Sequence, residues 1–96
     1  MKVEFTENGW KDFTYWITTD KKVVKKIIKL IEAIKRDPYT GIGKPEQLKH
    51  ELSGCWSRRI DQEHRLVYSI DEEVSVCSVI TCRKHYSSRK DITDSR

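Results

Sequence analysis

A strongly two-sided segment between Asp20 and Pro38 constrains the fold more than any other feature of the sequence. At about 100° per residue, its apolar side chains fall within an arc of about 160°, which is one face of a helix. Asp20 is a suitable N-cap, and Asp37 is predicted to stop the helix because the residue before a proline disfavours helical conformation. The apolar face consists of Val23, Val24, Ile27, Ile28, Leu30, Ile31 and Ile34.

The residues before this segment predict a strand and another helix. Residues 2–6 alternate apolar and polar side chains, which is typical of a half-buried strand. Asn8 is predicted to cap a helix that is interrupted at residues 18–20. The apolar positions of that helix follow the spacing i, i+3, i+6 and i+7 and are occupied by Trp10, Phe13, Trp16 and Ile17.

The second half of the chain predicts a loop and then strands. Residues 39–45 contain two glycines and a proline and are predicted to form a loop. Strand-like runs follow at residues 56–60, 65–70 and 74–82. The links between them are too short for a crossover and favour antiparallel pairing. The fold class is therefore α+β, with two N-terminal helices packed on one face of a mainly antiparallel, four- to five-stranded sheet.

Length and composition restrict the class of protein. A chain of 96 residues allows one domain, and 35% charged with 36% hydrophobic residues excludes collagen-like, low-complexity and fully disordered chains. No apolar run approaches the roughly 20 residues that span a bilayer. The first residues lack the apolar stretch of a secretory signal, so a cytoplasmic location without membrane association is expected.

The cysteines are odd in number and form no C-x-x-C pair. A disulfide framework or a structural zinc site would need an even set or tight His/Cys spacing. They are therefore predicted to be reduced thiols that act as small apolar residues on strands, and neither a metal nor a cofactor is expected. The three residues are Cys55, Cys77 and Cys82.

Positive charge is concentrated in the two-sided helix. Residues 21–36 carry seven Lys or Arg side chains and one Glu, a net charge of +6, whereas the whole chain has +4. Such a lysine face is usually a solvated surface, but it also fits contact with a polyanion. Charge alone does not choose between DNA, RNA and an acidic protein.

A second basic group comes from the loop and the strands, and includes an acid and several histidines. RNA cleavage by attack of the 2′-hydroxyl on its own phosphate needs a base, cations to hold the phosphate and an acid for the leaving oxygen. Glu46 and His85 are suitable types, but they are 39 positions apart and the spacing cannot establish that they converge. Each also has an ordinary explanation, as a solvated loop carboxylate or a cap on the sheet edge. Arg58 and Arg59 alternate on their strand, so at most one of them can serve this site directly. The whole group is Lys44, Glu46, Lys49, His50, Arg58, Arg59, His64, Arg65, Arg83, Lys84, His85 and Tyr86.

Several long motifs at these positions resemble the YoeB-type toxins, which belong to the RelE-like superfamily of bacterial toxin–antitoxin systems. The motifs occupy residues 43–50, 52–60, 63–68 and 82–86. The resemblance covers residues 1–86 and implies a single domain with the RelE-like microbial RNase fold. Relatives tend to end at the His-Tyr pair, whereas this chain continues through residues 87–96, a polar segment of net charge +1 that is expected to be a mobile tail.

The resemblance also implies an activity and a role for each residue. The activity is ribosome-dependent, metal-independent endonucleolytic cleavage of mRNA in the ribosomal A site, which inhibits translation. Glu46 would be the general base and His85 the general acid, while Arg65 would stabilise the phosphate and Tyr86 would shape the site. Cations expected to hold flanking phosphates or rRNA are Lys44, Lys49 and Arg59, together with Lys22, Lys25 and Lys29 on the helix.

The partners implied by the resemblance are a cognate acidic antitoxin whose C-terminal segment wraps the toxin, and the ribosome with its mRNA. Operator DNA would be bound only through the antitoxin complex, and homodimers are common in the family. An alternative hypothesis is a non-catalytic nucleic-acid- or partner-binding module on the same scaffold. A degenerate relative should have lost the base, the phosphate clamp or the acid, and all of them are retained here. A DNA-reading helix is disfavoured because lysines suit phosphates and not base edges.

Overall fold

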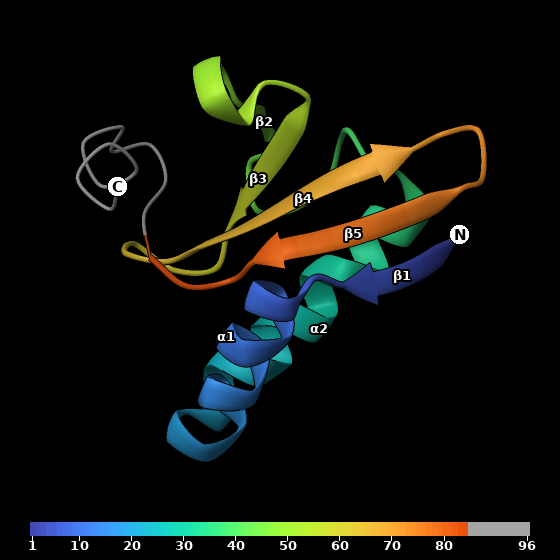
Figure 1. Cartoon of the computed structure of the whole chain (residues 1–96). Helices are drawn as coiled ribbons and strands as arrows, with labels where there is room; N and C mark the ends of the chain where they lie inside the picture. Colours follow the sequence, from blue (N-terminus) through green and yellow to red (C-terminus); the bar gives the residue numbers. More distant parts are fainter. Residues whose placement is uncertain (85–96) are drawn as a thin grey trace.

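Five strands form one mixed sheet with the order β1-β5-β4-β3-β2 in the computed structural model, which describes residues 1–84. The helices lie together on one side of this sheet (Figure 1). The elements are β1 (Lys2–Phe5), α1 (Glu7–Thr19), α2 (Lys21–Arg36), β2 (Glu46–Gln47), a 3₁₀ helix (His50–Leu52), β3 (Cys55–Arg59), β4 (Arg65–Asp71) and β5 (Val76–Thr81).

The topology confirms the predicted α+β class. Strands β2, β3, β4 and β5 pair antiparallel in succession, as their short links require. The first strand is different, because β1 pairs parallel with β5 in the register Lys2↔Val76 to Phe5↔Val79. Both helices and three strands separate β1 from β5 in the chain, so this pairing is not restricted to the antiparallel geometry of a hairpin.

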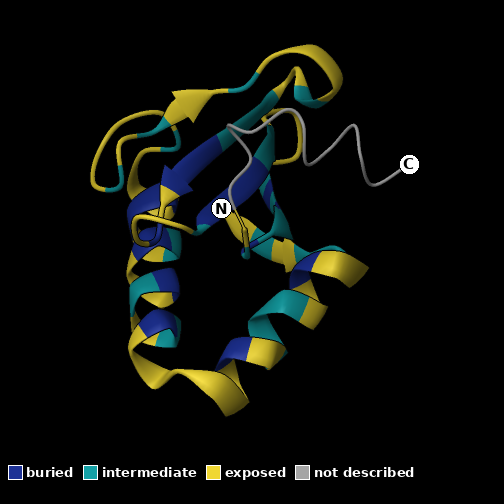
Figure 2. Ribbon diagram, turned by 90° about the vertical axis from the view of Figure 1, so that its left-hand side faces the viewer, coloured by how far each residue is buried: buried dark blue, intermediate teal, exposed yellow. Residues whose placement is uncertain are grey.

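The core lies between the helices and one face of the sheet. Leu66 and Tyr68 of β4 are fully buried on that face beneath α2, and Ile70 packs against them, as their alternation predicts. Buried residues are concentrated in the sheet and in stripes along both helices, while the connection between the helices is exposed (Figure 2). The predicted apolar face of α2 is wrong at one edge, because Ile28 is 48% exposed and Ala33 is buried instead. The buried stripe is thus displaced from the apolar arc of the sequence.

The helix ends are set by side-chain caps. Asp20 caps α2, as predicted, because its carboxylate accepts a hydrogen bond from the Lys22 N–H at 3.0 Å. Helix α2 also ends before Pro38 as predicted. The predicted cap of α1 is wrong: the N-cap is Thr6 and Asn8 lies inside the helix. The Thr6 hydroxyl accepts from the Gly9 N–H at 3.0 Å and donates to the Ile80 carbonyl at 2.8 Å, so it joins the helix to β5.

Strands β5 and β2 differ most from the predictions, while the ends of β1, β3 and β4 shift by at most one residue. Strand β5 begins at Val76 and not at residue 74, because residues 72–75 form a turn in which Ser75 has a φ of +56°. The short strand β2 falls just after the predicted loop, where Glu46 and Gln47 pair with β3. A glutamate and a glutamine have little intrinsic strand preference, so it is the neighbouring strand that creates β2.

The cysteines are free thiols, as predicted. Cys55 lies on β3 and is half-buried, Cys77 is buried on β5, and Cys82 is buried just after β5. Burial raises the pKa of Cys77 to about 11 and that of Cys82 to about 12. Within residues 1–84, no helix has the length and apolar character needed to cross a bilayer.

Candidate functional site

Glu46, Arg59 and Arg65 share the face of the sheet that turns away from the helices. Glu46 is paired with Ser57 across β2 and β3, and Arg59 is paired with Arg65 across β3 and β4. Paired residues, and residues two apart on one strand, project from the same face of a sheet. Adjacent strands are only about 4.8 Å apart. The fold therefore gathers one carboxylate and two guanidinium groups that are distant in the sequence; we call these three residues the sheet site.

The Arg65 guanidinium is held by the turn that precedes it. The side chain is only 8% exposed, and its Nη1 donates to the carbonyl oxygens of Asp61 at 2.8 Å and of His64 at 3.1 Å. Burial lowers the pKa of Arg65, and the charge of Arg59 lowers it further, against the opposing carboxylates of Asp61 and Glu46. Two neighbouring cations, of which Arg65 is buried and Arg59 exposed, favour an anion between them.

Arg58 has no part in this face, as its alternation with Arg59 predicts. It is fully buried on the helix side, while Arg59 is exposed. Its guanidinium donates to the carbonyl oxygens of Asp37 and Thr40 at 2.8 Å each and of Ile42 at 3.0 Å, and its Nε donates to the Tyr68 hydroxyl at 3.1 Å. Arg58 therefore fixes the turn that leads from α2 to β2.

The sequence alone did not indicate this positioning role of Arg58, because the residue is one of many cations there. A signal was present, because Arg58 falls on the same strand face as Trp56 and Ile60, which point to the core. A cation in such a position must find acceptors inside the protein.

The flanking cations lie in two separate places. Lys44 and Lys49 are exposed and lie two residues before and two residues after β2. Lys22, Lys25 and Lys29 are exposed on α2, in the helix layer and not on the face of the sheet site. Lys22 lies near the turn after β3, because it lines a cavity of about 270 Å³ together with Lys26 and Asp61.

The end of β5 is fastened by side chains from α1. The Trp16 indole N–H donates to the Cys82 carbonyl at 2.8 Å, and the Asp12 carboxylate accepts from the Cys82 N–H at 3.1 Å. Sequence reasoning assigned Trp16 to the apolar core, and Trp16 is indeed buried. Its polar contact was missed, because Cys82 is 66 positions away and no local pattern indicates such a bond.

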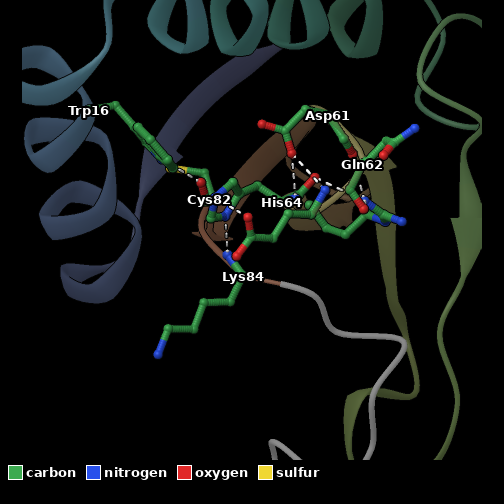
Figure 3. A network of polar contacts seen from close by, with 8 residues as sticks. Trp16, Asp61, Gln62, His64, Cys82 and Lys84 are labelled. Atoms are coloured by element: carbon green, nitrogen blue, oxygen red, sulfur yellow. Dashed lines mark hydrogen bonds and ion pairs between the residues drawn. The ribbon is translucent and has the colours of Figure 1, made fainter.

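The turn between β3 and β4 fastens the last described residue, Lys84 (Figure 3). The Lys84 N–H donates to Nδ1 of His64 at 2.8 Å, and the Lys84 carbonyl accepts from the Arg65 N–H at 2.9 Å. His85 and Tyr86 follow directly in the chain but lie outside the described residues, as does the predicted tail. Their roles remain predictions. Among the described residues, no three His, Cys, Asp or Glu side chains gather in a group that could hold a metal.

Comparison with known proteins identifies relatives of this chain. Residues 5–86 match the family model described as YoeB-like toxin of bacterial type II toxin-antitoxin system. Toxin YoeB of Escherichia coli (strain K12) is 51% identical over 86 residues, which are 90% of this chain and 100% of that protein.

Solved structures agree with the sequence comparison. The YoeB/ParE toxin from Agrobacterium tumefaciens is 46% identical with a TM-score of 0.87, covering 90% of this chain and 100% of that one. The Staphylococcus aureus toxin in a heterotetrameric YoeB-YefM toxin–antitoxin complex is 42% identical, with a TM-score of 0.80 over 90% of this chain and 98% of that one. A structure of the YoeB dimer from the same organism, also 42% identical, gives 0.82 over the same shares. The chain described here therefore belongs to the YoeB-like toxins of bacterial type II toxin–antitoxin systems.

Proposed function

We propose that this toxin is an endoribonuclease that cleaves mRNA in the ribosomal A site by attack of a 2′-hydroxyl on the adjacent phosphate, without a metal ion. The observation that carries the proposal is the sheet site. A carboxylate suited to act as a base lies there beside two arginines suited to hold a phosphate. Cleavage of mRNA on the ribosome would inhibit translation, which gives a toxin its effect.

The reaction assigns a task to each group. Glu46, exposed on the edge strand, takes the proton of the 2′-hydroxyl as its oxygen bonds to phosphorus. Arg65 and Arg59 stabilise the negative charge that builds on the phosphate. The bond from phosphorus to the 5′-oxygen then breaks, and His85 donates the proton that this oxygen needs. Tyr86 shapes the site around the leaving group. The products are a 2′,3′-cyclic phosphate and a 5′-hydroxyl, and addition of water to the cyclic phosphate then gives a 3′-phosphate.

The partners follow from the family. A cognate acidic antitoxin would neutralise this toxin, and the YoeB-YefM complex from Staphylococcus aureus supports this. The YoeB dimer of that organism supports a homodimer. Lys44 and Lys49, which flank β2, would hold flanking phosphates of the mRNA, and Lys22, Lys25 and Lys29 on α2 would contact rRNA. Operator DNA would be bound only through the antitoxin complex.

The experiment compares two glutamates on opposite edges of one sheet. Glu46→Gln on β2 should lower the cleavage rate on programmed ribosomes roughly 10²–10⁴-fold, because the amide cannot accept the 2′-proton. Glu4→Gln on β1 is the matched control, since Glu4 is also an exposed edge-strand carboxylate, and it should cleave like the unchanged protein. Equal activity of both variants would reject the role of Glu46. An unchanged protein that binds programmed ribosomes without cutting mRNA would favour the non-catalytic module.

A further inference from the structure

A second cavity lies between α1 and the end of β5, outside the sheet site. It has a volume of about 280 Å³, and none of the described residues that line it has an apolar side chain. Three of them are cations and one is a carboxylate, a net charge of +2. A hollow with an excess of one charge concentrates the potential that attracts the opposite charge. We call it the seam cavity, and its lining consists of Asn8, Lys11, Asp12, Thr81, Arg83 and Lys84.

The seam cavity has a rigid frame, because α1 lies directly against the backbone of β5. Gly9 leaves no room for a Cβ beside the Val79 carbonyl. Cys82 is held on both sides, since its N–H donates to the Asp12 carboxylate at 3.1 Å and its carbonyl accepts from the Trp16 indole at 2.8 Å. The walls therefore need little ordering when a ligand enters, which lowers the cost of binding.

Arg83 is the most firmly positioned cation of the seam cavity. Its guanidinium lies over the Tyr15 ring, 3.7 Å from the ring centroid. The residues on both sides of it are fixed, Cys82 by its bonds to α1 and Lys84 by the bond from its N–H to Nδ1 of His64 at 2.8 Å (Figure 3). A guanidinium stacked on a ring directs its N–H groups outward in its own plane, where two of them can bind a phosphate together.

The charge of these cations is left uncompensated. Within residues 1–84, no carboxylate forms an ion pair with Lys11, Arg83 or Lys84. The Asp12 carboxylate in the same cavity accepts the N–H of Cys82 instead. An anion that enters therefore meets cations that need not first be separated from another partner.

Thr81 supplies an independent observation that points to a ligand. Among the described residues, its Oγ1 is the only buried side-chain oxygen or nitrogen without a hydrogen-bond partner. Buried polar atoms in proteins are nearly always hydrogen-bonded. A hydroxyl can donate to an oxygen of an anion, so an anion bound in the seam cavity would satisfy it.

We propose that the seam cavity binds a phosphate of the RNA backbone, at a point separate from the phosphate held at Arg65. The inference rests on the proposed function for the source of the phosphate, since RNA is the substrate there. The Arg65 N–H donates to the Lys84 carbonyl at 2.9 Å, so the cavity borders the strand that carries the phosphate clamp. An acidic peptide fits less well, because the cavity offers no apolar side chain against which a peptide could pack.

Thr81→Val tests the site without a change of charge, because it removes the hydroxyl and keeps a β-branched side chain in the strand. The hydroxyl is unpaired in the described structure, so the variant should unfold at the same temperature as the unchanged protein or a higher one. Its affinity for inorganic phosphate should nevertheless fall about tenfold, the effect of one lost hydrogen bond to a charged group. Phosphate is titrated into ¹⁵N-labelled protein, and the signals of Thr81 and of the Arg83 Nε–H report binding.

Two double variants separate the seam cavity from general charge. Lys11→Gln with Arg83→Gln removes two cations of the cavity. Lys2→Gln with Arg36→Gln is the matched control, since it removes the same charges at exposed residues elsewhere. The probes are a 2′-O-methyl RNA oligonucleotide, which has no 2′-hydroxyl to attack, and ribosomes without mRNA.

The cavity variant should bind at least one of the two probes about tenfold more weakly, whereas the control should stay within about twofold of the unchanged protein. The salt dependence of oligonucleotide binding should lose a slope of roughly 0.7 if the phosphate belongs to a single strand. A loss with the oligonucleotide assigns the phosphate to mRNA and a loss with the ribosomes assigns it to rRNA; either result supports the proposal.

Three results would overturn the proposal. The first is a set of phosphate-induced shifts at Thr81 and Arg83 that do not saturate, which would indicate an adventitious ion only. The second is equal binding of both probes by the two double variants. The third is saturable binding of a polyglutamate peptide at the seam cavity without binding of phosphate. An unchanged protein that binds RNA through the seam cavity and leaves mRNA uncut on programmed ribosomes would support the inference and reject the proposed cleavage alone.

Discussion

Arg58 and Arg59 are adjacent on β3 but have different roles, because successive side chains of a strand point to opposite faces of the sheet. Arg59 is exposed beside Arg65 in the sheet site, whereas Arg58 is fully buried and donates to three carbonyls of the turn after α2. No carboxylate is bonded to the Arg58 guanidinium in the described part of the chain. Its charge is satisfied by backbone oxygens and the Tyr68 hydroxyl, so the turn and the cation depend on one another.

Arg58→Met should lower the free energy of unfolding by about 3 kcal/mol, because it leaves three part-buried carbonyl oxygens and the Tyr68 hydroxyl without their donor. In a domain of this size that corresponds to a fall in Tm of roughly 12–24 °C. Arg59→Met is the matched control and should change the free energy of unfolding by less than about 0.5 kcal/mol, since the Arg59 side chain is exposed. Urea unfolding of the two variants measures both values. A difference of less than about 1 kcal/mol between them would contradict the account of Arg58.

At the scale of single elements, α2 could be predicted from the sequence because its determinants are local. The cap at Asp20, the periodic apolar face and the stop before Pro38 all lie within the segment. Thr6 was not predicted as the cap of α1, because what favours it is distant: its hydroxyl also bonds to Ile80, 74 positions away. Strand β2 also depends on a contact outside its own segment, since Glu46 is in a strand only because β3 lies beside it.

The same reasoning applies to the candidate site. The alternation of Arg58 and Arg59 could be predicted from strand geometry alone. The approach of Glu46 to Arg65 could not, because it depends on the order in which three strands pair. The hydrogen bonds of Trp16 and His64 to the end of β5 are also results of tertiary packing.

Thr6→Ala should cost about 1 kcal/mol of stability, because the helix loses its N-cap oxygen. Asn8→Ala removes an exposed side chain from the first turn and should change the free energy of unfolding by less than about 0.5 kcal/mol. Thermal and urea unfolding of both variants decide between the two caps. A larger loss of stability from Asn8→Ala than from Thr6→Ala would show that Asn8 is the N-cap of α1, as the sequence predicts.

For the whole molecule, the two-layer architecture separates two basic surfaces. The sheet site is on the helix-free face, and the exposed lysines Lys22, Lys25 and Lys29 are in the helix layer. The two surfaces can therefore contact different phosphates at the same time. Binding to the ribosome and cleavage of the mRNA should then respond to different substitutions.

Replacing Lys22, Lys25 and Lys29 together by Glu should weaken ribosome binding and flatten its dependence on salt, because fewer phosphates are neutralised. The position of the cut in the mRNA should not change. A triple change of Lys2, Lys11 and Lys35 to Glu gives the same change of charge at other exposed lysines and should weaken binding less. Normal ribosome binding by the first variant at physiological salt would show that the α2 lysines are only a solvated surface.

The chemistry at the ends of the cut mRNA tests the central claim most directly. If Glu46 activates a 2′-hydroxyl and Arg65 holds the phosphate, the upstream fragment ends in a 2′,3′-cyclic phosphate or a 3′-phosphate and the downstream fragment begins with a 5′-hydroxyl. These ends can be distinguished by treating the fragments with phosphatase and kinase before ligation and sequencing. Fragments with a 3′-hydroxyl and a 5′-phosphate would contradict attack by the 2′-hydroxyl, and with it the roles given to the sheet site.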